Sequence, residues 1–197
     1  TYPLSYYDAS GWQGFEADVM REVAQRLQLQ LVTEPVGYDA MYDALKLGRV
    51  DAIISSVQVD PTQTEEIGFS RAYFDAGLRL VMPKALCCPA SDAAALKNQQ
   101  VSVALGSEAD RLLRYWQRRV AGLERVSVAS DAEAISALRD GHATLAIVPA
   151  LTPAALIAND ALDHRVIASV PYVIGVKREN HHLLSRINQA LEGLRKP

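Results

Sequence analysis

The spacing of apolar residues predicts alternating helices and strands along the first half of the chain. Within Phe15–Leu27, the residues Val19, Val23 and Leu27 fall four positions apart, which is the period of an amphipathic helix. Three further elements are expected: a strand over Gln30–Thr33, a helix over Tyr38–Leu47 and a short apolar strand over Asp51–Ile54. This alternation is typical of a parallel sheet covered by helices.

The same cycle returns in the second half. Strands are expected over Val101–Leu105, Leu123–Val128 and Leu145–Val148, and helices over Glu108–Arg119 and Ser130–Asp140. The segments ALKLGRVDAII (Ala44–Ile54) and ALRDGHATLAI (Ala137–Ile147) share one layout: a helix end, a glycine, a short spacer and a strand. We therefore expect two similarly built lobes.

Prolines and small residues separate these halves. The run PKALCCPAS (Pro83–Ser91) has the composition of a linker. The segments best suited to cross between lobes are Leu78–Met82 and Tyr172–Val176, and a last helix, His182–Leu194, is expected to pack back on the first lobe.

This order of elements predicts an α/β protein of two lobes joined by a two-segment hinge. Lobe one would comprise residues 1–82 and 175–197, and lobe two residues 83–174. A cleft between hinged α/β lobes is a usual place for a ligand, so we expect the binding site there.

Composition restricts the function further. The chain has 49% hydrophobic and 22% charged residues with a formal net charge of -3. No apolar run approaches the roughly 20 residues that cross a bilayer, and the start lacks a signal-peptide pattern, so we expect a soluble chain whose targeting segment has been removed. Mild acidity without a basic stripe argues against a nucleic-acid partner.

Cysteines and histidines give no metal pattern. Cys87 and Cys88 are adjacent, which is neither metal-ligand spacing nor a clip between distant segments. They form either a strained vicinal disulfide or two loop thiols. The histidines show no ligand spacing, and we expect no metal and no cofactor.

Three separated stretches carry a resemblance to a known family. They read SYYDASGWQGFEADVMREVAQRL, GYDAMYDALKLGRVDAIISS and GFSRAYFDAGLRLVM in chain order. In this order they resemble the bacterial extracellular solute-binding proteins of the polar amino-acid type, which have the type II periplasmic binding fold. Members of that family usually begin with a strand before the segment that opens this chain, Thr1-Tyr2-Pro3.

The resemblance implies particular ligand contacts. An aromatic that stacks on the ligand falls at Tyr38, and serines that offer hydroxyl and backbone groups to a carboxylate fall at Ser55 and Ser56. Backbone N–H groups at a helix start fall at Gly106 and Ser107. The other expected site positions are Gln58, where a small hydroxylated residue is common, and Tyr6, which with Tyr7 could line the cleft.

Both charged anchors for a free amino acid are replaced. The family's arginine, which holds the ligand carboxylate with its planar fork, falls at Gln63. The family's carboxylate for the ligand ammonium falls near Pro149, and Thr144 stands where an aspartate is common. We therefore expect atypical ligand anchors and weak binding of ordinary α-amino acids.

The resemblance implies a binding function without catalysis: extracytoplasmic capture of a small polar solute for an ABC-type importer, by a monomer in the periplasm or outside the cell that meets a membrane permease. A ligand-sensing domain of a membrane receptor is the alternative. An enzyme on the same fold is a third hypothesis, for which Glu108, Asp60 and Glu65 are candidates by position alone.

Overall fold

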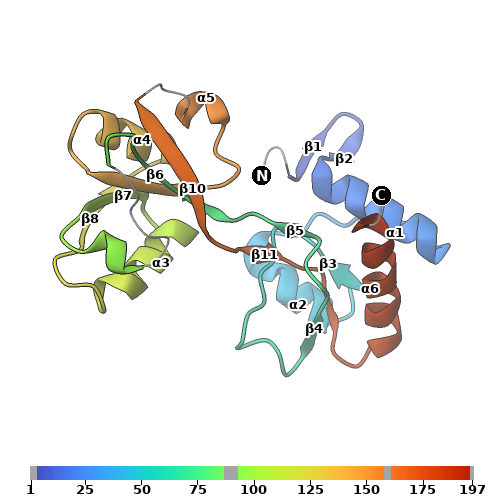
Figure 1. The fold of residues 1–197 in the computed structure, drawn as a ribbon. Coiled ribbons are helices and arrows are strands. Elements are labelled where there is room, and N and C mark those ends of the chain that lie inside the picture. Colours follow the sequence, from blue (N-terminus) through green and yellow to red (C-terminus); the bar gives the residue numbers. More distant parts are fainter. Residues whose placement is uncertain (1–3, 87–92, 158–160, 196–197) are drawn as a thin grey trace. The chain divides into compact units, whose positions relative to one another are not determined.

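The computed structural model describes residues 4–86, 93–157 and 161–195, and the chain forms two compact units (Figure 1). Unit 1 comprises Thr1–Asp75 and Pro171–Pro197, and unit 2 comprises Ala76–Val170. The cysteine pair, most of the expected linker and the opening Thr1-Tyr2-Pro3 lie outside the described residues.

Unit 2 is built on one mixed sheet. Its elements are β6 Leu78–Pro83, η2 Ala93–Leu96, β7 Gln100–Ala104, α3 Glu108–Gln117, β8 Glu124–Val128, α4 Asp131–Arg139, β9 Leu145–Pro149, α5 Ala154–Ile157 and β10 Leu162–Ala168. The strand order is β10-β6-β9-β7-β8. β7 pairs in parallel with β8 and β9, whereas β6 pairs antiparallel with β9 and β10. Helices α3 and α4 flank this sheet in Figure 1.

Unit 1 has short strands and longer helices. Its elements are β1 Tyr6–Asp8, β2 Gly11–Gln13, α1 Phe15–Leu27, η1 Tyr38–Ala40, α2 Met41–Lys46, β3 Ala52–Ile53, β4 Ile67–Phe69, β5 Phe74–Asp75, β11 Pro171–Tyr172, β12 Gly175–Lys177 and α6 His181–Arg195. β12, from the end of the chain, lies between β3 and β4 and is antiparallel to both. β1–β2 and β5–β11 form separate two-stranded antiparallel pairs.

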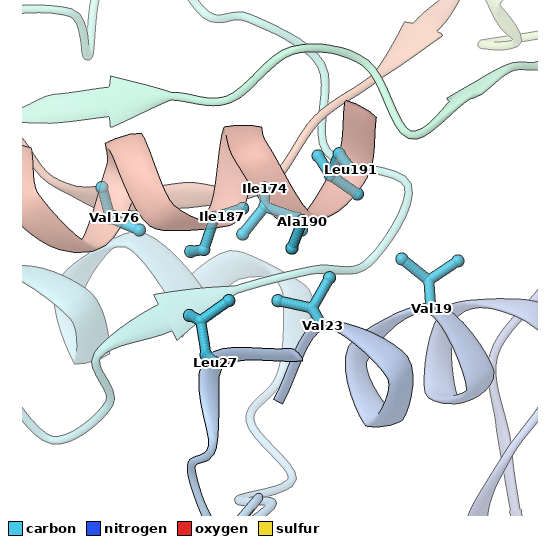
Figure 2. Close-up of a cluster of buried hydrophobic side chains, with 8 residues drawn as sticks. All are labelled: Val19, Val23, Leu27, Ile174, Val176, Ile187, Ala190 and Leu191. Atoms are coloured by element: carbon cyan, nitrogen blue, oxygen red, sulfur yellow. The ribbon is translucent and has the colours of Figure 1, made fainter. Parts of the chain in front are cut away.

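The last helix packs on unit 1, as predicted. Apolar side chains of α1 and α6 meet over β12 in the cluster drawn in Figure 2. Its members are Val19, Val23, Leu27, Ile174, Val176, Ile187, Ala190 and Leu191. A helix of this kind is held mainly by its buried apolar face rather than by intrinsic propensity.

The repeated layout seen in the sequence has the same local structure in both units. After α2, Gly48 has φ 74°, its N–H donates to the carbonyl of Leu45, and the next N–H donates to the carbonyl of Ala44. After α4, Gly141 has φ 76° and the equivalent two hydrogen bonds reach Leu138 and Ala137. Each helix therefore ends in a Schellman motif, which needs a residue with positive φ at the glycine position.

Three expectations differ from the structure. Gln30–Thr33 forms no strand, because β3 has β12 as its partner and no described strand pairs with this segment. The described strand pairs of unit 1 are antiparallel rather than parallel, because β12 enters between β3 and β4 from the far end of the chain in the opposite direction. Leu78–Met82 belongs to β6 within the sheet of unit 2.

The chain consequently passes between units at other residues than expected. The divisions lie after Asp75 and after Val170, rather than after residues 82 and 174. At the start of unit 2 the N–H of Ala76 donates to the carbonyl of Val170 over 2.9 Å, so the two ends of unit 2 lie side by side.

Candidate functional site

The serine-bearing loop after β3 is anchored to the core of unit 1. Val57 is completely buried, in a cluster with Leu45 and Ile67, and its carbonyl accepts a hydrogen bond of 2.8 Å from the N–H of Val173. Ser55, Ser56 and Gln58 are half-buried around it. The four residues Ser55–Gln58 are called the serine loop below.

A buried carboxylate holds Ser56. Glu16, at the start of α1, is completely buried, and its Oε1 accepts hydrogen bonds from the Ser56 N–H (2.6 Å) and the Ser56 hydroxyl (3.1 Å). Ser56 has φ 53°, in the left-handed region that a serine seldom adopts. The expectation that both Ser56 donors face a ligand is therefore corrected, because Glu16 takes them.

Tyr73 supplies a third donor to the same oxygen. Its hydroxyl donates to Glu16 Oε1 over 2.7 Å. Burial, together with the charge of Glu16 and the hydrogen bond to it, raises the pKa of Tyr73 far above its ordinary value of 10.0, so the phenol remains a donor. The Tyr73 ring also packs beside Phe15 and Tyr172, with centroids 6.3 and 6.5 Å away.

Tyr38 is available for contact with a solute. It begins η1 and is 61% exposed, so it is not a core aromatic. Tyr42, one turn later, has its pKa raised by burial and by the proximity of Tyr38 and Asp60. Asp60 in turn accepts hydrogen bonds from the hydroxyl (2.7 Å) and the N–H (2.8 Å) of Thr62, which lower its pKa. One exposed aromatic, one half-buried tyrosine and one ionised carboxylate therefore gather here.

Gln63 lies in the turn that follows. Its N–H donates to the carbonyl of Asp60 over 3.0 Å, and its own carbonyl accepts from Glu66 (3.1 Å) and Ile67 (2.9 Å). Its side-chain Oε1 is buried and has no hydrogen-bond partner. The backbone of this position is thus fixed, while the neutral side chain replaces the cation that the family resemblance leads one to expect.

The N–H groups of Gly106 and Ser107, just before α3 of unit 2, already donate hydrogen bonds within the protein. Gly106 has φ 76°, and its N–H donates to Asp110 Oδ2 over 3.0 Å. The Ser107 N–H donates to the carbonyl of Ala104 over 3.2 Å, and the Ser107 hydroxyl caps α3 by accepting from the Asp110 N–H. The expected anion seat therefore keeps neither of these two N–H groups for a ligand.

Asp110 is a buried carboxylate that pairs with two arginines near the start of α3. The residue is 1% exposed, and its oxygens accept hydrogen bonds from Arg114 (2.7 Å), Arg125 and the Gly106 N–H. Burial opposes its ionisation, but the hydrogen bonds from Arg114, Gly106 and Arg125 and the charge of Arg125 outweigh that effect and lower the pKa of Asp110 to about 2.

The remaining predicted positions are placed as follows. Tyr6 lies in β1, opposite Gln13, and is 37% exposed. Thr144 exchanges hydrogen bonds with the backbone of Gln100 through its hydroxyl, so it fixes a strand start. Pro149 ends β9. The six expected residues of unit 1 and the two of unit 2 are thus positioned within their own units.

Sequence reasoning missed Glu16, Tyr73 and Asp110. A usable signal existed for two of them. Glu16 falls on the face of α1 that carries Val19, Val23 and Leu27, where a charge is unexpected. Asp110 follows the helix cap by three residues, where an acidic side chain can turn back to N–H groups. Tyr73 offered no such sign.

Unit 1 has two open hollows among its described residues. One, of about 460 Å³, is lined by charged side chains of which Lys46 pairs with Glu66. The other, of about 350 Å³, runs along α6, and there Arg71 pairs with Glu192. Glu65, a candidate acid or base by position alone, lines the first hollow, whereas none of the eight expected ligand contacts lines either one.

The described residues offer neither a metal cluster nor a helix suited to span a membrane. Within residues 4–86, 93–157 and 161–195, no group of three or more histidine, cysteine, aspartate or glutamate side chains is arranged to hold a metal ion. No helix in the same ranges has the length and apolar character to span a membrane.

Comparison with known proteins gives one consistent result. Over its whole length the chain is similar to the L-cystine-binding protein TcyJ of Escherichia coli (25% identity, covering 100% of this chain and 75% of the relative). It is also similar to the lysine/arginine/ornithine-binding periplasmic protein of Escherichia coli (27% identity, 98% and 78% covered).

Solved structures agree with this. Holo arginine-binding protein from T. maritima is 28% identical with a TM-score of 0.60, covering 100% of this chain and 87% of that chain. An ancestral cationic amino acid solute-binding protein, at 22% identity, has a TM-score of 0.73 with 98% and 85% covered and supports the fold alone. The predicted type II periplasmic binding fold is confirmed. The profile of the bacterial extracellular solute-binding proteins, family 3, matches residues 1–197, and the chain belongs to that family.

Proposed function

We propose that this protein binds a small polar solute of amino-acid type outside the cytoplasm and delivers it to the permease of an ABC importer. The observation that carries the proposal is the match of the family profile to residues 1–197. Relatives support the ligand class, since their names include cystine-, lysine/arginine/ornithine- and histidine-binding proteins. A relative from Haemophilus influenzae is named a probable amino-acid ABC transporter-binding protein, which supports the permease partner.

The proposed contacts in unit 1 are Tyr38, the serine loop, Gln63 and Tyr6. Tyr38 would supply apolar stacking, because most of its ring is exposed. The Ser56 donors face Glu16, so a role for the serine loop would rest on Ser55, Gln58 and the shape of the backbone. Gly106 and Ser107 of unit 2 remain proposed contacts through their exposed surface rather than through their N–H groups.

The proposed role is binding without catalysis, by a monomer in the periplasm with no nucleic-acid partner. The three carboxylates considered as acids or bases are poor candidates for catalytic groups. Glu108 pairs with Arg111, and Asp60 is tied to Thr62, whose hydrogen bonds lower its pKa and favour the ionised form. Glu65 lies on the rim of a hollow with paired charges.

A thermal-shift screen over the common amino acids, L-ornithine, L-cystine, small amides, amines and carboxylates tests the proposal. A solute at a hundred times its dissociation constant should stabilise the chain by ~2.7 kcal/mol. We expect at least one amino-acid-type solute to raise the melting temperature, and titration calorimetry to give a stoichiometry of one. No response to any compound of the screen at millimolar concentration would overturn the proposed ligand class.

Replacing Tyr38 with alanine should weaken the best solute of that screen several-fold. Stacking on an aromatic ring contributes ~0.5–1.5 kcal/mol beyond the area it buries. Titration calorimetry measures the loss. The matched control is Tyr115→Ala, because Tyr115 is 52% exposed on α3 and should leave the affinity unchanged. Equal affinities of the Tyr38→Ala variant and the wild-type chain would remove Tyr38 from the site.

A further inference from the structure

We propose that Glu16 is a positioning residue for solute binding: its carboxylate holds the serine loop in the conformation that receives the solute. The inference rests on the proposed function, because it concerns the same site. Glu16 itself is completely buried and acts through Ser56.

Ser56 has an unusual backbone conformation. Its φ of 53° is one that residues with a side chain adopt rarely, and such a conformation persists where surrounding contacts determine it. Those contacts are two hydrogen bonds to Glu16 Oε1, one from the backbone N–H and one from the hydroxyl. Val57 is then turned into the core, and Ser55 and Gln58 are placed on either side of it.

Glu16 Oε1 also bonds Tyr73, near the boundary of unit 1. Tyr73 donates its hydroxyl to Glu16 Oε1, and Tyr73 lies just before Asp75, where the chain leaves unit 1. The N–H of Tyr73 donates to the carbonyl of Tyr172, in the strand by which the chain returns. One carboxylate oxygen therefore joins α1 to the serine loop and to Tyr73, and the backbone of Tyr73 is in turn bonded to β11.

The second carboxylate oxygen of Glu16 distinguishes a positioning role from a contribution to stability. Glu16 Oε2 is buried and has no hydrogen-bond partner. A buried carboxylate with one unpartnered oxygen is unfavourable for folding, and apolar residues of similar size often stabilise such a place better. Stability alone therefore does not account for a glutamate here, whereas its hold on the Ser56 backbone does.

The test combines solute affinity with a measure of the loop itself. The variants are Glu16→Ala, Glu16→Gln, Ser56→Ala and the double variant Glu16→Gln/Ser56→Ala. The matched control is Val23→Ala, which truncates a buried side chain about two turns further along the same helix, in the cluster with α6. Affinity is measured by calorimetry with L-arginine, L-glutamine and L-cystine, well below each melting temperature. Amide hydrogen exchange of Ser56 is measured relative to the core strand residue Val176 in each protein.

We expect Glu16→Ala to weaken binding at least tenfold and Glu16→Gln, which keeps an acceptor oxygen, to weaken it less. Val23→Ala should lower the melting temperature but leave the affinity within about twofold. Ser56→Ala removes the hydroxyl bond but keeps the shorter N–H bond to Glu16, so Glu16→Gln should still weaken binding in the Ser56→Ala background, by less than it does in the wild-type chain. Ser56 exchange relative to Val176 should rise in Glu16→Ala and not in Val23→Ala.

Different failures have different meanings. Wild-type affinity in both Glu16 variants, or equal losses in Val23→Ala, would overturn the positioning role and leave the proposed function intact. If Glu16→Ala does not fold, Glu16→Gln and the double variant decide the matter by the same criteria. If the wild-type chain binds none of the three amino acids, the proposed ligand class loses its support, and unchanged Ser56 exchange in the Glu16 variants would show separately that the carboxylate does not hold the loop.

Discussion

Replacing Gln63 with arginine should tighten the binding of an α-amino acid by about 2- to 30-fold. A hydrogen bond between neutral groups contributes ~1 kcal/mol net, whereas one involving a charge contributes ~1.5–3 kcal/mol, and each 1.4 kcal/mol is a factor of about ten. The backbone at residue 63 is held in its turn by hydrogen bonds to Asp60, Glu66 and Ile67. A longer side chain there can therefore extend toward a carboxylate from a fixed base.

The control for this prediction is Gln63→Lys. It adds the same charge without the planar fork that meets both oxygens of a carboxylate, so its gain should be smaller. Calorimetric titration of the three proteins with the same amino acids measures the difference. At Pro149, where the family resemblance implies a carboxylate for the ligand ammonium, this chain has none, so the gain should stop short of tight binding. An unchanged or lower affinity in Gln63→Arg would mean that the missing cation does not limit amino-acid binding.

The Asp110→Asn substitution should lower the free energy of unfolding of unit 2 by about 1.5–3 kcal/mol at neutral pH. The substitution keeps the size of the side chain but removes the charge that receives Arg114, Arg125 and the Gly106 N–H. Trp12 and Trp116 are the two tryptophans, one in each unit, so a Trp12→Phe background isolates the fluorescence of unit 2 during urea unfolding.

The effect of this substitution should depend on pH in one direction. The folded state lowers the pKa of Asp110 from 3.8 to about 2, so the stabilisation is fully present above about pH 4 and is lost as pH falls through about 2. The gap between wild type and Asp110→Asn should therefore close over that interval. The exposed Asp140, at the end of α4, provides the control Asp140→Asn. A gap that stays constant down to pH 2 would contradict the ion-pair account.

Local sequence signals predicted the helices well. The period of Val19, Val23 and Leu27 gave α1 with the bounds Phe15–Leu27, and the serine before α4 gave its cap. Gly48 and Gly141 marked two helix ends that share one hydrogen-bond pattern. These features depend on residues a few positions apart, and that information is present in any short window of the sequence.

Strand partners were harder, because pairing is decided by residues far apart in the chain. Gln30–Thr33 has a strand-like composition but pairs with no described strand, whereas β10, Leu162–Ala168, was not expected and pairs along the whole of β6. The direction of β12 relative to β3 is likewise fixed by how the chain returns from unit 2. Such contacts leave no periodic trace in either segment alone.

The candidate site shows the same division. The exposed Tyr38 and the glycine turn before α3 agree with what neighbouring residues in the sequence predict. The sequence could suggest that Ser56 and Gly106 offer hydrogen-bond donors, but not that Glu16 takes those of Ser56. Glu16 lies forty residues from Ser56, whereas Asp110 lies only four residues from Gly106, in the first turn of α3.

The hydrogen bond between Ala76 and Val170 also bears on how the chain folds. Unit 2 is one continuous segment, so all its contacts can form as soon as that segment has left the ribosome. Unit 1 needs β12 and α6, which are made last, to complete its sheet and its helix pair. Its closing contacts span the whole of the inserted unit, and contacts of high sequence separation form slowly. When unit 2 is folded, its two ends are adjacent, so the two chain segments of unit 1 are held close together. The effective loop that unit 1 has to close is thereby shorter.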